Sequence, residues 1–312
     1  MNVKIKIGLS LAMCFLMHGA YSQIKVDNSN YKSGSAESSR SNYIESQLPA
    51  GKKWKMVWND EFDGVTLDTT KWGYRLYYWQ TRHETLTKDG ASLDGKGNLL
   101  LKVYEKDGKF YSSTLQTGSM YLDQPGVRKG KNTEAWPIGK LETPKFAHRF
   151  GYYEIRCKLP TKSEGWWPAF WIQSPCIGST LDPGISGVEI DIMENFKRDE
   201  QTRSAVLWNG YGPYGKGGCS CDNPRPGISE GYHTFGLDWS GGDYIFYIDG
   251  KEHWRFNGPV SGIEEFILVS TECAGYREGA PSPLLKKENL PDYFIVDYVR
   301  VFDEVNVDGT KK

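Results

Sequence analysis

The chain has 312 residues, in which 38 lysines and arginines nearly balance 39 aspartates and glutamates, and 14% of the residues are aromatic. This balance, without a basic cluster, excludes the electrostatic footprint of a nucleic-acid-binding protein, and the polar mean hydropathy excludes an integral membrane protein. The aromatic content excludes disorder over the whole length, because aromatic side chains supply much surface for burial.

Residues 1–22 are typical of a secretory signal peptide. Lys4 and Lys6 precede an apolar run over residues 7–17, and small residues follow near position 22. The run is shorter than the roughly 20 residues that a spanning helix needs, so we expect no membrane span. The segment around Cys14 weakly resembles a lipoprotein signal, which leaves a lipid anchor as the alternative to soluble export. We expect an exported protein, in the periplasm, at the cell surface or outside the cell.

The remaining chain divides into three parts. Residues 23–53 are rich in serine, asparagine and lysine and lack apolar periodicity, which predicts a flexible tether. Residues 54–304 have no internal repeat, and they are predicted to form a single domain. Residues 305–312 are a short polar tail.

The cysteines favour no special chemistry. The chain has 6 cysteines, and removal of Cys14 with the signal leaves an odd number in a compartment that permits disulfides. Cys219 and Cys221 could indicate a metal or redox site, but the ligand spacing of a zinc site is missing. A structural disulfide to Cys176 or Cys273, or plain loop thiols, is the favoured interpretation.

Short segments with alternating, aromatic or β-branched residues predict β-strands between glycine, proline, asparagine and aspartate turns. These segments are residues 98–104, 151–159, 169–173, 188–194, 232–239, 244–248, 266–271 and 293–302. Asp249 and Gly250 predict a tight hairpin after residues 244–248, because this pair tolerates positive φ. Without a long helical stripe, the pattern predicts an all-β fold, a two-sheet sandwich of the jelly-roll type.

Residues 166–173 (WWPAFWIQ) predict a strand with two different faces. One face carries Trp167, Ala169, Trp171 and Gln173, and the opposite face carries Phe170 and Ile172. Indole rings stack on the C–H faces of sugars, so this strand fits a carbohydrate cleft. For any single tryptophan, packing in the core is an equally good interpretation.

Residues 188–194 (VEIDIME) carry three acids on the next predicted strand. Alternation places Glu189 and Asp191 on one face and Glu194 on the other, with the apolar residues. A bulge near residues 192–193 would return Glu194 to the face of the other two acids. We expect this bulge, and with it a row of three carboxylates on one exposed surface.

Such a row suits the hydrolysis of glycosidic bonds. Retaining glycosidases need two carboxyl groups about 5 to 5.5 Å apart, which Glu189 and Glu194 could reach across a concave sheet. Asp191 between them would hydrogen-bond a neighbouring carboxyl group, and crowding would keep one proton in the group. The alternative is a solvated strand face, and the neighbouring tryptophans favour the cleft.

The sequence resembles glycoside hydrolase family 16, the retaining endo-β-glycanases with a concanavalin-like jelly roll. The resemblance rests on residues 189–194 (EIDIME), which match the bulged form of the family's active-site strand, and on residues 167–171 (WPAFW) and 151–156 (GYYEIR). In family order, it extends to residues 58–64 (WNDEFDG), 246–250 (FYIDG) and 296–301 (VDYVRV). The bulged type includes agarases, porphyranases and laminarinases.

The resemblance implies a role for each acid. Glu189 is expected to be the nucleophile, Asp191 its electrostatic partner, and Glu194 the acid/base. No organic cofactor is expected. Family members often carry a structural calcium, for which Glu61 and Asp297 are the candidate ligands here, although acids at strand ends are ordinarily only solvated.

Some features depart from the laminarinase pattern. Residues 203–210 (RSAVLWNG) lack the histidine that laminarinase-like members usually carry there. Glu272 resembles an acid of agarases, porphyranases and carrageenases, and Trp79 and Arg82 resemble a loop used for charged galactans. Arg82 could bind a sulfate or carboxylate, or only pair with Glu84. The candidate sugar-binding residues are Trp79, Arg82, Trp167, Trp171, Trp208, Asn209 and Glu272.

The sequence therefore predicts a secreted retaining endo-β-glycosidase, acting as a monomer on a polysaccharide or glycan. A β-linked galactan or galactose-containing glycan is the expected substrate, and a β-1,3 or mixed-linkage glucan is the alternative. A lectin-like binding module on the same sandwich is an alternative of another class. A metal or redox protein built on Cys219 and Cys221 is a third.

Overall fold

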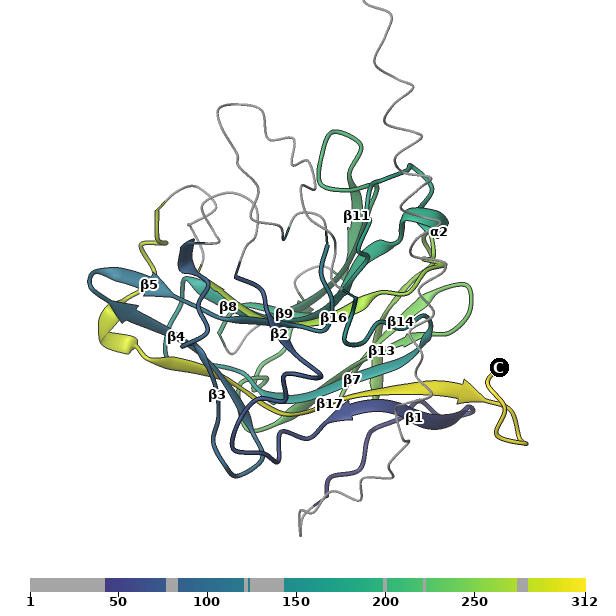
Figure 1. Cartoon of the computed structure of the whole chain (residues 1–312), viewed down its shortest axis with the longest axis horizontal. Helices are drawn as coiled ribbons and strands as arrows, with labels where there is room; N and C mark the ends of the chain where they lie inside the picture. The colour runs from purple at the N-terminus through teal and green to yellow at the C-terminus, as the bar shows by residue number, and fades with distance from the viewer. Residues whose placement is uncertain are drawn as a thin grey trace, which may run out of the picture.

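The computed structural model describes residues 43–76, 84–120, 123, 143–198, 201–220, 223–273 and 280–312. In this part of the chain, antiparallel strands form two sheets that lie one above the other (Figure 1). The predicted all-β, two-sheet sandwich is confirmed.

One sheet has nine strands among the described residues, in the order β15-β14-β13-β7-β17-β4-β3, with β1 paired to β17 and β5 to β4. We call it the β17 sheet. Its strands are β1 (Lys53–Asp60), β3 (Ala91–Leu93), β4 (Leu99–Lys106), β5 (Lys109–Tyr111), β7 (Gly151–Lys158), β13 (His233–Trp239), β14 (Tyr244–Ile248), β15 (Lys251–Phe256) and β17 (Asp292–Val305).

The other sheet, which we call the β9 sheet, has eight described strands in the order β11-β10-β9-β8-β16-β6-β2, with β12 paired to β10. Its strands are β2 (Gly73–Tyr74), β6 (Thr114–Gln116), β8 (Trp166–Gln173), β9 (Val188–Lys197), β10 (Gln201–Trp208), β11 (Lys216–Cys219), β12 (Asn223–Pro224) and β16 (Phe266–Cys273). The short helical elements are α2 (Pro183–Ser186) and η5 (Lys287–Asn289).

The hairpin predicted at Asp249 and Gly250 joins β14 to β15. Both residues have positive φ, 49° and 70°. Such φ values match the turn to the right-handed twist of the two strands, which explains the aspartate–glycine pair.

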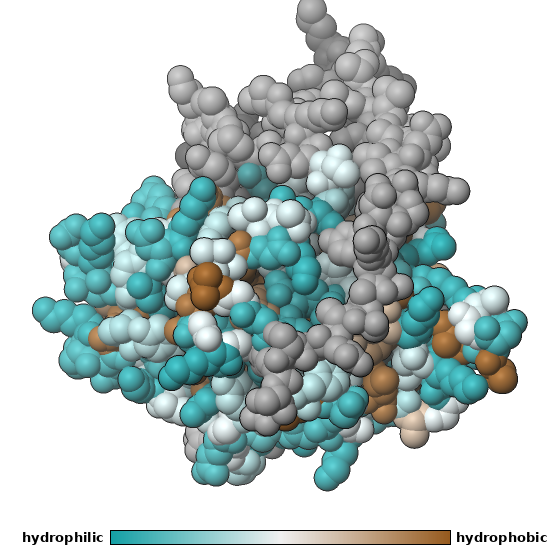
Figure 2. All heavy atoms as spheres, turned by 60° about the horizontal axis from the view of Figure 1, so that its bottom comes forward, coloured by the Kyte–Doolittle hydropathy of each residue, from teal (hydrophilic) through white to brown (hydrophobic). Residues whose placement is uncertain are grey.

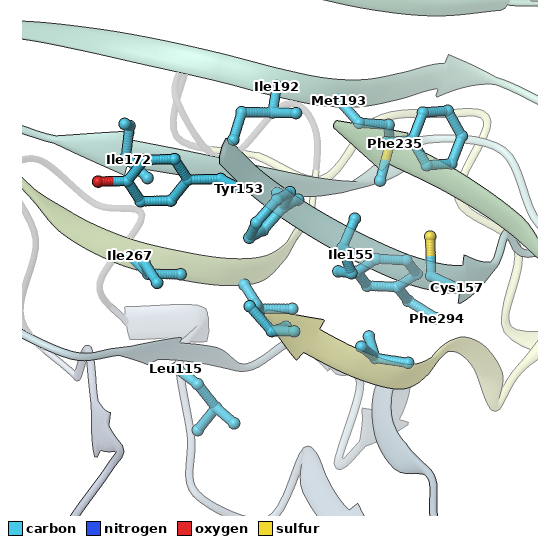
Figure 3. Close-up of a cluster of buried hydrophobic side chains, with 14 of the residues drawn as sticks. Leu115, Tyr153, Ile155, Cys157, Ile172, Ile192, Met193, Phe235, Ile267 and Phe294 are labelled. Carbon is cyan, nitrogen blue, oxygen red and sulfur yellow. The ribbon is translucent and has the colours of Figure 1, made fainter. Parts of the chain in front are cut away.

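The core lies between the sheets and consists of the inward-facing residues of both (Figure 3). The β9 sheet contributes Leu115, Ile172, Ile192, Met193 and Ile267, and the β17 sheet contributes Tyr153, Ile155, Cys157, Phe235 and Phe294. All of these side chains are at most 1% exposed. Because alternate residues of β8 and β9 fill this core, the residues between them must face outward, on the far side of the β9 sheet.

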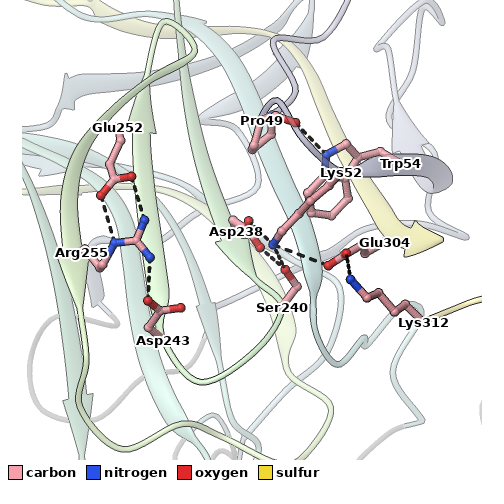
Figure 4. Close-up of polar contacts among 10 residues, drawn as sticks. All are labelled: Pro49, Lys52, Trp54, Asp238, Ser240, Asp243, Glu252, Arg255, Glu304 and Lys312. Atoms are coloured by element: carbon pink, nitrogen blue, oxygen red, sulfur yellow. Dashed lines mark hydrogen bonds and ion pairs between the residues drawn. The ribbon is translucent and has the colours of Figure 1, made fainter. Parts of the chain in front are cut away.

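The described C-terminal part of the predicted tether makes polar contacts with the β17 sheet. The backbone N–H of Gln47 donates to Glu154 at 2.9 Å, and Arg300 donates to the carbonyl of Ile44 at 2.8 Å. Lys52 forms an ion pair with Asp238 at 2.6 Å (Figure 4). The described residues 43–52 are therefore held against the β17 sheet, because this polar segment finds partners in the strands' own charged residues. The rest of the predicted tether and the predicted signal peptide lie outside the described residues.

The surface in view in Figure 2 is mostly hydrophilic, with apolar residues in small separate spots. Large exposed apolar side chains such as Val65, Leu181 and Val307 come from different parts of the chain. Among the described residues, no helix has the length and apolar character that crossing a membrane requires.

Candidate active site

Strand β9 contains the predicted bulge. Its ladder with β8 pairs Phe170 with Met193 and Trp171 with Asp191, so one step on β8 corresponds to two on β9. Its ladder with β10 pairs Arg203 with Glu194 and Ala205 with Asp191, so two steps correspond to three. Both ladders place an extra residue between Asp191 and Glu194, and the ladder with β8 identifies it as Ile192. The predicted bulge is confirmed.

The bulge brings the three acids to one side of the sheet. Glu189, Asp191 and Glu194 all line one cavity on the outer face of the β9 sheet, whereas Ile190 and Ile192 are at most 1% exposed in the core. Without the extra residue, alternation would have turned Glu194 into the sandwich. One inserted residue therefore creates a site with three carboxylates.

Strand β8 supplies the aromatic wall of the cavity. Trp167 and Trp171 line it together with Ala169, while Phe170 and Ile172 are buried in the core. This confirms the two faces expected for the strand. The indole N–H of Trp171 donates to Ser270 Oγ at 3.0 Å, which orients the ring from β16.

Glu189 lies among neutral hydrogen-bond donors. The amide of Gln173 donates to Glu189 Oε2 at 2.9 Å, and the Tyr211 hydroxyl donates to the same oxygen. Arg75 donates to Gln173 Oε1 at 3.1 Å, which determines the orientation of the amide. Donors to a carboxylate favour its ionised form, so this arrangement suits a nucleophile.

Asp123 and Trp171 hold the side chain of Arg75 in place. Its Nε donates to Asp123 at 2.7 Å, and its guanidinium lies 5.2 Å from the centre of the Trp171 ring. Burial raises the pKa of Asp123 although Arg75 acts to lower it. Arg75 lines the cavity, and sequence reasoning missed it together with Tyr211, because neither residue belongs to a recognisable motif.

Glu194 has a cationic neighbour instead. Arg203 of β10, the cross-strand partner of Glu194, donates to its Oε2 through Nε at 3.2 Å and Nη2 at 2.9 Å. Burial acts to lower the pKa of Arg203, but the attraction of Glu194 outweighs it, and the pKa is raised. The same attraction favours the ionised form of Glu194. Arg203 was not singled out by the sequence analysis, although strand pairing alone places it here.

Two predicted sugar-binding residues lie away from this cavity. Trp208 and Asn209 are not among the described residues that line the cavity. Leu207 pairs with Glu189, so the next residue, Trp208, has the opposite orientation and packs on the core, 5.7 Å from the ring of Phe256 in the β17 sheet. Asn209 follows with a φ of 63° as the chain leaves β10.

The remaining candidates have different outcomes. Glu272 of β16 lines the cavity and pairs across the strands with Trp167. Trp79 and Arg82 lie outside the described residues, so their predicted contacts stay predictions.

The candidate calcium ligands are both engaged by arginines. Glu61 accepts two hydrogen bonds from Arg300, each 2.8 Å long, and Asp297 accepts one from Arg156 at 2.6 Å. A cation at either carboxylate would face a guanidinium group, so the two residues as placed do not fit a calcium ion. Within the described ranges, no group of three or more histidine, cysteine or acidic side chains could hold a metal ion.

Two of the described cysteines are unsuited to redox chemistry. Cys157 and Cys273 are buried, and burial raises the pKa of both thiols, which keeps them protonated and unreactive. Cys221 lies outside the described residues.

Comparisons with known proteins agree with this geometry. The model of the family "Glycosyl hydrolases family 16" matches residues 87–261. Glucan endo-1,3-beta-glucosidase A1 of Niallia circulans is 27% identical over 274 residues, which are 82% of this chain but only 39% of that protein. Beta-porphyranase E of Zobellia galactanivorans is 25% identical over 286 residues, 83% of this chain and 91% of that protein.

The fold is that of solved structures with a jelly-roll sandwich. The laminarinase from Flavobacterium sp. UMI-01 superposes with a TM-score of 0.59 and 21% identity, over 80% of this chain and 100% of that chain. At this identity the likeness concerns the fold, and it confirms the predicted jelly-roll architecture.

Proposed function

The chain belongs to glycosyl hydrolases family 16, and from this membership we propose that it is a retaining endo-β-glycanase acting through a glycosyl-enzyme intermediate. The observation that carries the proposal is the row of Glu189, Asp191 and Glu194 along one cavity beside two tryptophans. A sugar bound on these indoles has carboxylates within reach of one glycosidic bond.

In the first step, Glu189 attacks the anomeric carbon of the bound sugar. The bond from this carbon to the glycosidic oxygen breaks, and Glu194 gives its proton to that oxygen, so the leaving chain departs as an alcohol. Gln173 and Tyr211 hold the attacking carboxylate in place through their hydrogen bonds. Asp191, between the two glutamates, assists by its charge.

In the second step, water releases the sugar from Glu189. Glu194, now a carboxylate, takes a proton from the water, whose oxygen bonds to the anomeric carbon while Glu189 leaves as a carboxylate. Two inversions at the same carbon restore the β configuration. No metal or organic cofactor takes part in either step of this scheme.

The charge of the cavity favours an uncharged sugar at the reacting centre. Four carboxylates line it, Glu189, Asp191, Glu194 and Glu272. The lining guanidinium, that of Arg75, already pairs with Asp123 at 2.7 Å. Arg203 is likewise paired with Glu194, at 2.9 Å. An anionic substituent on this sugar would therefore face several carboxylates, while both guanidinium groups are already engaged.

We propose a β-linked galactan or galactose-containing glycan as the substrate, cut next to a neutral unit. The support is Glu272 in the cavity wall and a β10 strand that pairs Arg203, rather than a histidine, with Glu194. A β-1,3 or mixed-linkage glucan is the second candidate, because relatives such as the Niallia protein are named glucanases.

A polysaccharide panel tests the proposal. The purified protein is incubated with agar, porphyran, carrageenan, mucin glycans, laminarin and mixed-linkage glucan, and the products are separated by chromatography. We expect oligosaccharides from a galactan, with none released by Glu189→Gln. Release of oligosaccharides from laminarin alone would show that the substrate is a β-1,3-glucan and not a galactan.

The panel also separates an enzyme from a lectin-like module. The Glu189→Gln variant keeps the shape of the cavity, so we expect it to retain polysaccharide binding, measured by affinity electrophoresis. A wild-type protein that binds a polysaccharide but releases no sugar from any polymer would contradict the enzyme and support the lectin-like module.

We further propose that the protein is exported by the signal expected over residues 1–22. N-terminal sequencing of protein recovered from the periplasm, the cell surface and the medium tests this. A mature chain that begins near residue 23 supports the signal, whereas recovery only in the cytoplasm with an intact N-terminus contradicts it.

A further inference from the structure

The bulge in β9 interrupts the regular pairing of this strand with both of its neighbours. Ile192 has no cross-strand partner in the ladder to β8 or in the ladder to β10. A bulged residue loses its ladder hydrogen bonds, and a buried carbonyl without a partner is costly. A side-chain donor to the Ile192 carbonyl would therefore stabilise the bulge.

Ser204 of β10 supplies that partner. It lies between Arg203 and Ala205, opposite the extra residue, and its hydroxyl donates to the carbonyl of Ile192 at 2.8 Å. The side chain is buried. Two hydrogen bonds with Ser220 fix its backbone: Ser204 N–H donates to Ser220 Oγ at 3.0 Å, and Ser220 N–H donates to the Ser204 carbonyl at 2.9 Å.

His253 of β15 completes the arrangement from the other sheet. Its Nε2 lies 3.2 Å from Ser204 Oγ. A hydroxyl has one hydrogen, and that of Ser204 goes to the Ile192 carbonyl, so the hydroxyl accepts from Nε2–H of His253. The chain of hydrogen bonds runs from the β17 sheet, through Ser204, to the bulge of the β9 sheet.

The surroundings of His253 keep this imidazole neutral. Burial, with a smaller contribution from Arg225, lowers its pKa to about 4. The ring of Phe246 packs edge-on against it at 6.3 Å. At neutral pH the imidazole therefore adds no charge behind the active site.

We propose that Ser204 and His253 are positioning residues that hold the β9 bulge at Ile192 and thereby keep Glu194 on the face of Glu189 and Asp191. This inference rests on the proposed function, in which Glu194 is the acid/base. Glu189 precedes the bulge and has its own partners, Gln173 and Tyr211, so the two glutamates depend on Ser204 unequally.

The different dependence of Glu189 and Glu194 on Ser204 should be measurable in the reaction. Loss of the Ser204 hydroxyl removes this hydrogen bond to the Ile192 carbonyl and lets the bulge relax, which moves Glu194 more than Glu189. Proton donation to the leaving oxygen then suffers, while nucleophilic attack is spared. A poor leaving group needs this proton, but a good one departs as a stable anion without it.

The test compares two aryl glycosides of the oligosaccharide that the wild type releases, one of phenol and one of 2,4-dinitrophenol. For Ser204→Ala we expect kcat/KM to fall about 50-fold with the phenyl glycoside. With the dinitrophenyl glycoside we expect a loss of about threefold or less. A loss of folded protein alone would reduce both by the same factor.

Three variants serve as controls. Ser204→Thr keeps the hydroxyl, and we expect it to keep the wild-type ratio between the two substrates. Thr117→Val removes another buried hydroxyl of the β9 sheet, one that donates to the Phe146 carbonyl at 2.7 Å and lies away from the bulge. We expect it to lower the melting temperature with no change in the ratio. His253→Phe, which removes the donor, should shift the ratio in the direction of Ser204→Ala, whereas His253→Gln should restore it in part.

The outcomes decide the proposal. Equal losses on both substrates in Ser204→Ala, or a ratio equal to that of Thr117→Val, would show that the hydroxyl only stabilises the fold. If Ser204→Ala does not fold, the His253→Phe and His253→Gln pair gives the same decision by the same ratio. A wild type that is inactive on every polysaccharide defeats the proposed function, whereas an active wild type with unchanged ratios defeats only this inference.

Discussion

Glu189 and Glu194 belong to the same strand but have contrasting environments. Glu189, before the bulge, accepts hydrogen bonds from the neutral Gln173 and Tyr211. Glu194, after the bulge, lies against the charged Arg203. Neutral donors suit the nucleophile proposed for Glu189, whereas a cation beside Glu194 suits the acid/base proposed for it, because the cation affects how readily the carboxyl group exchanges its proton. The neighbouring side chains on β8, β10 and the loop after β10 therefore distinguish the two glutamates, although both lie on the same strand.

Replacing each glutamate by alanine should have the largest effect. For Glu189→Ala we expect a loss of about 10⁴-fold in kcat, because the attacking group is gone. For Glu194→Ala we expect a loss of about 10²-fold or more, since proton transfer contributes this much. Assays with the activated aryl glycoside and sodium azide distinguish the roles.

Azide should give products of opposite configuration in the two variants. In Glu194→Ala it replaces water in the second step and yields a β-glycosyl azide. In Glu189→Ala it takes the place of the missing carboxylate and yields an α-glycosyl azide. Proton NMR of the products reads the configuration, and the reverse pattern would exchange the two assignments.

Tyr211→Phe tests the neutral side of the comparison. Loss of this donor leaves Glu189 less well oriented and less favoured as a carboxylate, so we expect kcat/KM to fall about tenfold. Because the ionised form is required for attack, the acidic limb of the pH profile should also move to higher pH. Tyr214→Phe is the control, since this tyrosine lies nearby in the chain and is 68% exposed. A wild-type profile for Tyr211→Phe would contradict the role.

Arg203→Gln tests the charged side. Glu194 raises the pKa of Arg203 against the effect of burial, and the same attraction favours ionised Glu194. The first step needs protonated Glu194, so without Arg203 the protonated form persists to higher pH. We expect the basic limb of kcat/KM to move upward by about one pH unit.

Arg255→Gln is the matched control for Arg203→Gln. Arg255 lies on β15, in the other sheet, and pairs with Asp243 and Glu252. We expect its pH profile to match that of the wild type. A basic limb that moves downward in Arg203→Gln would overturn the account of Glu194.

A buried acid behind the site should affect stability more than activity. Burial raises the pKa of Glu265 to about 8, and its Oε1 accepts a hydrogen bond from the N–H of Val188 at 2.9 Å. With a folded pKa above the unfolded value, the stabilising contribution is complete below about pH 4.5 and is lost as the pH rises through 8.

Glu265→Gln removes this titration and keeps an acceptor for Val188. We therefore expect the melting temperature of the wild type to fall between pH 5 and 9 by more than that of the variant, in parallel scans by calorimetry. Similar curves for both proteins would mean that Glu265 does not titrate in this range. Activity at pH 6 should change least of all the variants considered.

Much of the fold follows from local patterns. Alternation in residues 166–173 correctly separates the tryptophan face of β8 from Phe170 and Ile172 in the core. The three acids of residues 189–194 required a bulge to share a face, and the ladders contain one. Asp249 and Gly250 predict their hairpin, because both residues tolerate positive φ. The two faces of β8 and the hairpin depend on neighbouring residues alone.

Other parts of the site depend on long-range packing. The sequence analysis placed Trp208 and Asn209 in the site, but strand pairing turns Trp208 to the core. Glu61 and Asp297, the candidate calcium ligands, accept hydrogen bonds from Arg300 and Arg156, which are far from them in the chain. Arg75, Tyr211 and the Ser204–His253 contact could not be predicted, because each joins segments that are distant in the chain.

The sequence by itself determined the strand faces and the identity of the three acids, because side-chain direction in a strand is a local property with a period of two residues. Only the tertiary structure decided which side chains surround each acid. Those partners come from other strands, other loops and the opposite sheet, and their positions follow from how the sheets pair and stack rather than from any local pattern.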